Sequence, residues 1–386
     1  MLQFLSKAEW ILFIIMAIPV GYYLVFSFFS LWGGGKKYPV AKKKSRVVVL
    51  IPAYKEDRVI EGSVRSLMAQ EYPENKMDIV VISDKMRDET NEMLSTLPVK
   101  LLAINPEISS KAVALNMAIE SLRGEKYDLI VILDADNVVD PNFISEINDA
   151  FYFGLTAIQA HRTAKNLNND MAILDAISEE INNSIFRKGH VNMGFSSALI
   201  GSGMAFDYKW FKHIVKQLST SGEDKELEIL LFKDRIFVDY LDNLMVYDEK
   251  IQGERGFYNQ RRRWIAAQFG SLFSALKDLP GAIFSRNIDY VERIFVWMLP
   301  PKIIIMGIIA LTSLVTLVLQ WRLTIKWWAL LVLMLISFAM AVPDFLITKR
   351  SLKAINRLPL IFIMMFINLF RTKGVNKKFI HTNKDF

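Results

Sequence analysis

Apolar residues gather near the two ends of this 386-residue chain, and a longer stretch of mixed polar and apolar residues separates them. Residues 10–32 contain no charged side chain and are long enough to cross a hydrocarbon core of roughly 30 Å as one helix. Ile303–Trp321 and Trp327–Ile347 have the same character, with a short turn, Arg322–Lys326, expected between them. Leu358–Phe370 is apolar but shorter, and we expect it to lie in the membrane interface. The pattern predicts three spans, with a fourth crossing as the main alternative.

Between these segments, short aliphatic runs alternate with helical patterns. Continuous branched and aliphatic residues are typical of strands in a parallel sheet that is covered on both faces. Four such runs are Val47–Ile51, Asp78–Ile82, Val99–Ile104 and Asp128–Leu133. In Lys111–Leu122, apolar residues recur at the spacing of a helix. Strands that alternate with helices predict a doubly wound α/β domain, which binds ligands at the carboxyl ends of its strands.

Basic residues lie beside the apolar segments and account for much of the net charge of +7. They follow the first span as Lys36, Lys37, Lys42, Lys43, Lys44 and Arg46, and the third as Lys349, Arg350, Lys353 and Arg357. This position favours contact with anionic membrane lipids over binding of nucleic acid. It also predicts that both flanks, and the basic tail Arg371–Lys384, stay in the cytoplasm, with the N-terminus outside. The absence of cysteine excludes a disulfide framework and a Cys-ligated zinc.

Acidic side chains stand where the expected strands end. Asp134-Ala135-Asp136 follows directly on an aliphatic run, where carboxylates are costly to bury unless a cation compensates them. Such oxygen ligands suit Mg²⁺ or Mn²⁺, which also bind a diphosphate. The alternative is a solvated turn, or a helix N-cap before Asp140-Pro141. The second run ends at Asp84 and the first at Pro52–Glu56, so three strands are expected to bring polar groups to one edge of the sheet.

Four further segments offer chemistry, and each has a plainer alternative. Lys111 opens a helix and could approach a phosphate, although a lone lysine is more often a surface residue. Gly201-Ser202-Gly203 either allows close backbone approach to a ligand or forms a plain turn. Glu223-Asp224 begins a helical segment, where acidic residues commonly only stabilise the helix dipole. Residues 260–264, Gln-Arg-Arg-Arg-Trp, form either a basic membrane-surface patch or a phosphate clamp with an aromatic platform for a sugar.

Taken in chain order, these segments resemble the family-two glycosyltransferases with the GT-A fold, in particular the cellulose synthase and hyaluronan synthase branch. The matching residues, between Val47 and Ser285, are Pro52-Ala53-Tyr54 with Glu56, Asp84, Lys111-Ala112 with Asn116, Asp134-Ala135-Asp136, Gly201-Ser202-Gly203, Glu223-Asp224 with Leu227, and Gln260 with Arg263-Trp264. Each piece is weak alone, whereas the series that ends in Gln-x-x-Arg-Trp is specific.

The resemblance implies an integral enzyme of the cytoplasmic (inner) membrane that depends on Mg²⁺ or Mn²⁺. It would transfer a hexose, with inversion, from a donor such as a UDP-sugar to a growing glycan or polysaccharide at the cytoplasmic face. The residue roles that it implies are the following: nucleotide-sugar binding by Pro52, Ala53, Tyr54, Glu56, Asp84, Lys111, Asp134, Gln260 and Arg263; metal binding by Asp134 and Asp136; catalysis by Asp224 as general base beside Glu223; and acceptor binding by Gly201, Ser202, Gly203 and Trp264.

Five units are expected along the chain. They are an N-terminal transmembrane helix (1–35), a cytoplasmic GT-A domain (46–260), interfacial amphipathic helices (261–300), two transmembrane helices (301–348), and an interfacial helix with a basic tail (349–386). The interfacial unit includes an apolar stripe with Ile265, Leu272 and Phe273, for which ordinary packing against the catalytic domain is the alternative.

The chain departs from the family pattern in two ways. Gly222 precedes Glu223, where the family often has threonine, and three spans are fewer than polymer-secreting members have. A homo-oligomer or a separate export partner would be compatible with so few spans. The nearest alternative activity is addition of one sugar to a lipid or polyprenyl-phosphate acceptor, although such relatives typically lack Gln-x-x-Arg-Trp. A non-catalytic scaffold that retains the fold is the alternative from another class.

Overall fold

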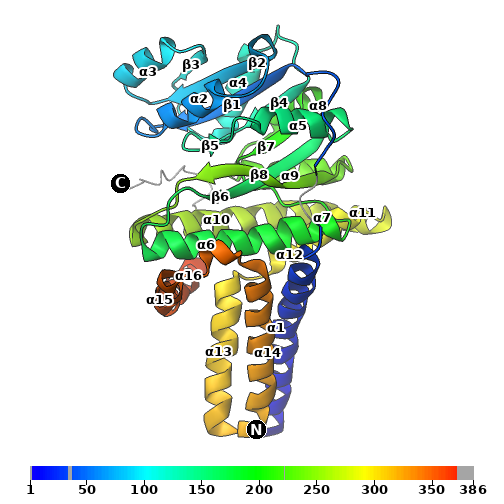
Figure 1. Ribbon diagram of the computed structural model, residues 1–386. Helices are drawn as coiled ribbons and strands as arrows, with labels where there is room; N and C mark the ends of the chain where they lie inside the picture. The colour runs from blue at the N-terminus through cyan, green and yellow to red at the C-terminus, as the bar shows by residue number, and fades with distance from the viewer. Residues whose placement is uncertain (1, 34–36, 221, 372–386) are drawn as a thin grey trace.

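The computed structural model describes residues 2–33, 37–220 and 222–371, which form a head that contains a sheet and a stem of long helices (Figure 1). The stem consists of α1 (Leu2–Ser30), α13 (Lys302–Leu319) and α14 (Trp321–Ala341). Lys36 and residues 372–384 of the basic tail lie outside the described residues.

The stem helices have the length and composition of membrane spans, as does the segment Lys349–Phe370. At the end away from the head, Glu9 of α1 accepts hydrogen bonds from Lys326 Nζ (2.8 Å) and Trp327 Nε1 (2.6 Å) of α14. The expected turn at Arg322–Lys326 is wrong, because these residues belong to the first turns of α14 and the chain reverses at Gln320. The polar side chains of this segment lie in the first turns of α14 and not in a loop. Placing the start of the span after the last charged residue therefore put the helix boundary too late in the sequence.

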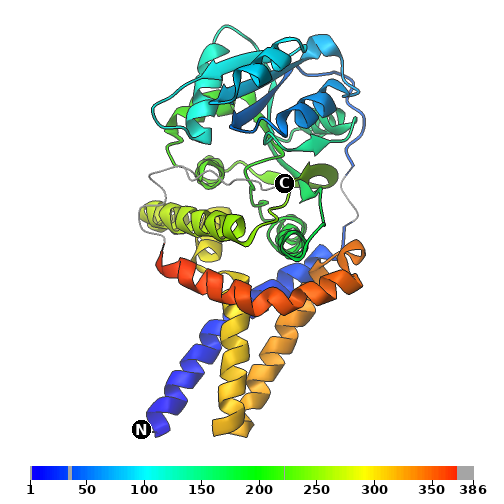
Figure 2. The ribbon, with the colours of Figure 1, turned by 90° about the vertical axis from the view of Figure 1, so that its left-hand side faces the viewer.

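The C-terminal helices α15 (Lys349–Ala354) and α16 (Leu358–Phe370) lie across the stem where it meets the head (Figure 2). Asn368 Nδ2 of α16 donates to the Tyr258 carbonyl oxygen at 3.1 Å, and Arg262 Nε donates to the Arg371 carbonyl oxygen at 2.6 Å. This crosswise orientation is the arrangement expected of an interfacial helix, and the number of crossings stays a prediction.

The head is built on one eight-stranded sheet with the order β3-β2-β1-β4-β7-β6-β8-β5. Its strands are β1 (Val47–Tyr54), β2 (Met77–Asp84), β3 (Lys100–Ile104), β4 (Leu129–Ile132), β5 (Val138–Val139), β6 (Ala157–Ala164), β7 (Met204–Asp207) and β8 (Val238–Asp248). The four expected strands are confirmed as the parallel set β1 to β4. The sheet is nevertheless mixed, because β7 runs antiparallel to both β4 and β6, so a wholly parallel doubly wound sheet is wrong.

Helices cover both faces of this sheet. In the head they are α2 (Ile60–Met68), α3 (Asp88–Ser95), α4 (Lys111–Ser121), α5 (Phe143–Tyr152), α8 (Tyr208–Ile214) and α9 (Glu223–Lys233), whereas α7 (His190–Asn192) packs against α1. Alternate residues of β1 enter two cores, Val48 and Leu50 on one face and Val47, Val49 and Ile51 on the other. Burial on both faces explains why the strand has a continuous aliphatic sequence instead of an alternating one.

A layer of helices separates the sheet from the stem (Figure 1): α6 (Asp170–Asn183), α10 (Glu254–Ala275), α11 (Leu279–Phe284) and α12 (Ile288–Met298). The expected unit boundary between residues 260 and 261 falls inside α10, so the Gln-x-x-Arg-Trp series lies on one helix. The apolar stripe of α10 divides. Ile265 and Leu272 are buried in the protein, as the packing alternative predicts, whereas Phe273 is 67% exposed.

Candidate active site

A cavity of about 870 Å³ begins at the carboxyl ends of β1, β2 and β4 and continues between α6 and α10 to the helices of the stem. The expected site residues that line it are Pro52, Ala53, Tyr54, Glu56, Asp84, Lys111, Asp134, Asp136, Gly201, Glu223, Asp224, Gln260, Arg263 and Trp264. Residues more than 200 positions apart in the sequence therefore share one space. The convergence expected from the ends of three strands is present in the fold.

The outer end of the cavity is formed where β1 and β2 end side by side, with Tyr54 and Asp84 as register partners. Lys55 and Lys85 follow these strands in the left-handed backbone region, both at φ 54°, which is unusual for residues with a side chain. Their ammonium groups lie 5.4 and 5.8 Å from the Tyr54 ring centre. Burial raises the pKa of Asp84, and the two lysines only partly oppose it. The arrangement offers an aromatic ring and a carboxyl group to one ligand, with two cations beside the ring.

Lys111 connects three parts of the site, so it is not a lone surface lysine. Ser110 caps α4 by accepting from the Val113 amide at 3.1 Å, and this cap fixes the point at which the helix begins. The Lys111 ammonium contacts the Asp134 carboxylate and donates to the Gly201 carbonyl oxygen at 2.7 Å. Burial alone would lower its pKa, but Asp134 and Glu223 raise the pKa above its usual value. Lys111 is therefore a charged tether between these segments.

Asp134 and Asp136 offer hard oxygen ligands at the end of β4, and Asp136 is only 3% exposed. Asn137 Nδ2 donates to Asp136 at 3.2 Å and to Asp248 at 3.1 Å, which holds the aspartate turn in place. The described residues contain no group of three His, Cys, Asp or Glu side chains that could by itself hold a metal ion. Mg²⁺ commonly binds one or two carboxylates together with substrate phosphates. The donor set therefore fits an ion that is shared with a diphosphate.

The Gly201-Ser202-Gly203 turn supports the aspartates, and only Gly201 lines the cavity. Ser202 and Gly203 do not line this cavity, and the acceptor contacts expected of them stay predictions. The Ser202 hydroxyl is fully buried, contacts Asn137 and accepts from the Asp134 amide at 2.9 Å. A Cβ on Gly203, at φ 64°, would lie 2.9 Å from Val246 Cγ2. The small residues thus allow close packing beneath the site.

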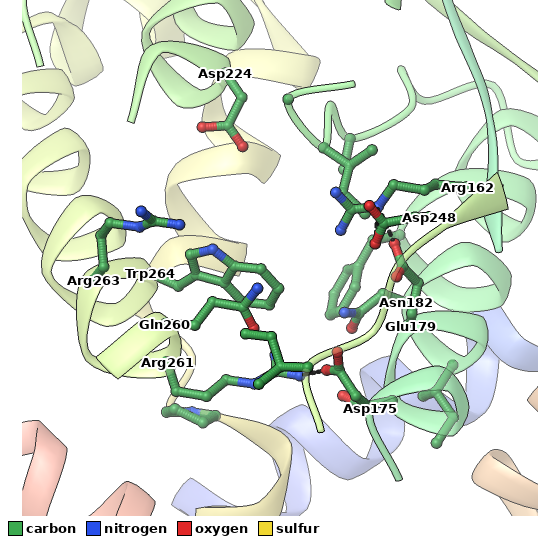
Figure 3. A pocket seen from close by; sticks show the side chains of 18 of the residues that line it. Arg162, Asp175, Glu179, Asn182, Asp224, Asp248, Gln260, Arg261, Arg263 and Trp264 are labelled. Atoms are coloured by element: carbon green, nitrogen blue, oxygen red, sulfur yellow. Dashed lines mark hydrogen bonds and ion pairs between the residues drawn. The ribbon is translucent and has the colours of Figure 1, made fainter. Parts of the chain in front are cut away.

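The first turn of α9 brings acidic groups to the opposite wall. Figure 3 shows Asp224 at the top of the cavity, with its carboxylate directed into the space above α10. Glu223 is 7% exposed and lies 3.7 Å from the Lys111 ammonium. Burial raises the pKa of Glu223 to about 7 although Lys111 lowers it. One turn later, Glu228 pairs with Arg293 of α12 at 3.3 Å, so α9 is anchored to the helix layer.

Gly222 precedes this turn because α10 leaves no room for a side chain. A Cβ at Gly222 would lie 2.8 Å from the Ala267 Cβ, which is fixed to the helix backbone. We expect Gly222→Ala to destabilise the protein by about 1–3 kcal/mol, since overpacking forces the backbone to shift. Thermal unfolding in detergent measures the change. Gly124→Ala is the matched control because its Cβ would meet open space. Equal melting temperatures for the two variants would contradict this explanation of Gly222.

α10 presents Gln260, Arg263 and Trp264 to the cavity, since residues three and four positions apart share a helix face. Gln260 Oε1 is buried and has no hydrogen-bond partner within the described part of the chain. Burial lowers the pKa of Arg263, and Glu223, Asp134 and Asp224 partly compensate. Arg263 therefore lies within electrostatic range of both acidic walls.

Arg261 covers one face of the Trp264 ring, 4.4 Å from its centre, and also contacts the Asp175 carboxylate of α6. This contact joins α10 to α6 across the cavity (Figure 3). Only the other face and the edges of the Trp264 ring are left to meet a sugar.

Sequence reasoning missed the wall opposite α10. Arg162 of β6 pairs with Glu179 of α6 at 2.7 Å, and Lys250 pairs with Asp248 at 2.9 Å and contacts Glu179. Asp175 and Glu179 stand four residues apart in α6, which places both on one face of the helix. The four-residue spacing of these acidic side chains could have predicted that α6 directs a polar face into the cavity.

Comparison with known proteins identifies the family. The model of glycosyltransferase-like family 2 matches residues 45–267. The probable glycosyltransferase YdaM of Bacillus subtilis strain 168 is 26% identical over 144 residues, 33% of this chain and 34% of the relative. The beta-monoglucosyldiacylglycerol synthase of Trichormus variabilis is 24% identical over 232 residues, 56% of this chain and 48% of the relative. The chain thus spans about a third to a half of the length of these curated relatives.

Among solved structures, the mannosyltransferase PcManGT from Pyrobaculum calidifontis, in complex with GDP-mannose and Mn²⁺, has a TM-score of 0.50 at 16% identity. The match covers 84% of this chain and 98% of that protein. The likeness shows the GT-A-like α/β fold, and the cellulose and hyaluronan synthase branch stays a prediction. The family model matches more than half of the residues of this chain, and the chain therefore belongs to glycosyltransferase family 2.

Proposed function

We propose that this chain transfers a hexose from a nucleotide-diphosphate donor, such as a UDP-sugar, to an acceptor at the membrane surface, with inversion at the anomeric carbon. The observation that carries the proposal is the single cavity in which Asp224 and Arg263 meet the aspartate turn at the end of β4. An in-line displacement needs a base on one side of the reacting carbon and charge stabilisation of the leaving group on the other.

The donor end of this site carries side chains that are suited to bind a nucleotide. Residues 52–56 and Asp84 hold the uracil and ribose, with the Tyr54 ring as their aromatic element. Asp134 and Asp136 hold Mg²⁺ or Mn²⁺, which when bound neutralises charge on the diphosphate. The Mn²⁺ in the structure of the mannosyltransferase supports a divalent ion in this fold. Lys111 adds positive charge and keeps Asp134 in place.

Asp224 is the general base. It takes the proton of the acceptor hydroxyl as the acceptor oxygen bonds to the anomeric carbon and the bond to the diphosphate breaks. Gln260 and Arg263 bind the departing diphosphate, and Trp264 contacts the acceptor sugar through its uncovered face. Glu223, buried against Lys111, positions Asp224 and is not itself a second base.

The stem is embedded in the inner membrane, with the head in the cytoplasm, and the basic residues after α1 support this orientation. A growing glycan is one acceptor. The continuation of the cavity to the stem helices favours a second candidate, a single addition to a lipid. The Trichormus relative is a beta-monoglucosyldiacylglycerol synthase, and this activity agrees with a lipid acceptor.

A screen of UDP-hexoses with the purified full chain tests the proposal. We expect release of UDP with at least one donor in the presence of Mg²⁺ or Mn²⁺ and none with EDTA. NMR of the product should show a β-linkage from an α-linked donor, and retention would exclude Asp224 as the base of a single displacement. A protein that neither binds UDP nor releases it from any donor would be a scaffold.

A further inference from the structure

The stem end of the cavity is apolar. Its walls include Ile303 and Met306 of α13, Leu335 and Phe338 of α14, and Leu358 and Ile361 of α16. All three helices lie in or across the stem, where the surrounding solvent is hydrocarbon (Figures 1 and 2). A soluble nucleotide sugar has no apolar part that would occupy such a space. The cavity therefore has one end suited to a nucleotide and another suited to hydrocarbon chains.

Two cations that line this cavity have no carboxylate partner among the described residues. Lys302 opens α13, and its ammonium donates to the Ser178 carbonyl oxygen at 3.3 Å and contacts the Asn182 side-chain oxygen. Arg187 follows α6 on the π-helical turn η2 (Ser184–Gly189) and is 4% exposed. Arg187 Nη1 donates to Asn183 Oδ1 at 2.8 Å, but its Nε is buried and has no hydrogen-bond partner in the part of the chain that the structure describes. Both residues line the cavity.

Three other cations near this cavity have carboxylate partners. Arg162, Lys250 and Arg261 contact Glu179, Asp248 or Asp175, whereas the ion pairs among the described residues include neither Arg187 nor Lys302. A buried cation without an anion is unfavourable, since its lost hydration is not replaced. A guanidinium and an ammonium at the wall of a cavity are suited to a phosphate, which accepts several charge-assisted hydrogen bonds. The missing anion is best supplied by a ligand.

We propose that the stem end of the cavity binds an acceptor lipid whose headgroup carries a phosphate, with Arg187 and Lys302 as the phosphate ligands. The inference rests on the proposed function and adds the class of acceptor. The hydrocarbon chains lie between α13, α14 and α16, and a hydroxyl beyond the phosphate reaches Asp224. The oxygen of that hydroxyl bonds to the anomeric carbon, and its proton goes to Asp224. The bond between the anomeric carbon and UDP breaks, and UDP leaves with the electron pair of that bond.

Lipid binding to the full chain in detergent, measured by native mass spectrometry, tests the assignment. The probes are dioleoylphosphatidylglycerol, neutral dioleoylglycerol and inorganic phosphate. We expect the phospholipid to bind at least about 10-fold more tightly than the neutral lipid, since two charge-assisted contacts are lost in the latter. Inorganic phosphate at millimolar concentration should not displace it. If it does, or if the two lipids bind equally, the lipid-phosphate site is wrong.

Variants locate the site. Lys302→Met should weaken phospholipid binding about 10-fold and leave binding of dioleoylglycerol and UDP unchanged, and Lys302→Arg should restore it. Arg322→Met is the control, since Arg322 is an exposed cation at the far end of the stem. Equal phospholipid binding by Lys302→Met and the wild type would overturn the assignment. If Lys302→Met loses UDP binding, the variant is misfolded. The comparison of phospholipid with neutral lipid in the wild-type protein then tests the assignment.

The same preparation separates the two proposals. If UDP is released from a donor but the phospholipid shows no preference, only the lipid inference fails. If the wild-type protein binds no UDP, the proposed function fails whatever lipid it binds.

Discussion

Replacing Asp224 with asparagine should lower kcat by about 100- to 10,000-fold, the range that a positioned general base contributes, and leave the affinity for UDP nearly unchanged. Asparagine has almost the same shape but cannot accept the proton of the acceptor hydroxyl. Asp224 is at the top of the cavity, across from Arg263 and Trp264, and the proposed nucleoside end lies at β1 and β2. UDP release at saturating donor and calorimetry with UDP and Mn²⁺ measure the two quantities.

Asp234→Asn is the matched control for this substitution. Asp234 directly follows the other end of α9 and accepts a hydrogen bond from Trp210 Nε1 at 2.7 Å, which an amide oxygen also accepts. We expect wild-type turnover from this variant. If Asp224→Asn keeps its turnover, or loses UDP affinity in proportion to turnover, then Asp224 is not the base.

Arg263→Ala should lower kcat by about 100- to 1,000-fold, as the loss of one preorganised group at a developing negative charge commonly does. Burial disfavours the charged guanidinium and lowers the pKa of Arg263, and the acidic neighbours Glu223, Asp134 and Asp224 oppose this effect. Removing it should therefore affect transfer more than the melting temperature. Steady-state kinetics and thermal unfolding of the same preparation compare the two effects.

Arg262→Ala separates a phosphate clamp from a basic membrane patch. Arg262 is the neighbouring residue on α10, but it does not line the cavity and it donates to the Arg371 carbonyl oxygen. A phosphate clamp predicts a large loss of kcat for Arg263→Ala and a small loss for Arg262→Ala. Similar losses for both variants would support the membrane patch that the local sequence alone equally allowed.

The strands and the donor side of the site could be predicted because local sequence determines them. Val47–Ile51 is continuous and aliphatic since β1 is buried on both faces, and polar residues follow because parallel strands end at one edge. The position of Lys111 followed from its helix start, but its contact with Asp134 depends on tertiary packing. A lone lysine carries no local sign of such a partner.

Other features depend on contacts between distant segments. The antiparallel course of β7 is set by pairing with β4 and β6, and Met204–Asp207 has no sequence pattern that fixes strand direction. Ser202 lies behind the cavity because its hydroxyl oxygen accepts a hydrogen bond from the Asp134 amide. The polar face of α6 could have been found from Asp175 and Glu179, but its partners on β6, on α10 and in the segment after β8 could not.

The most direct test is an experimental structure of the full chain with UDP and Mn²⁺. The account predicts the ion at about 2.0–2.2 Å from a carboxylate oxygen of Asp136 or Asp134 and from the diphosphate, as expected for a small divalent cation bound by oxygen. The Arg263 guanidinium should face the β-phosphate, and Asp224 should lie across the space left for the sugar. A diphosphate bound away from these aspartates, or an Arg263 directed out of the cavity, would contradict it.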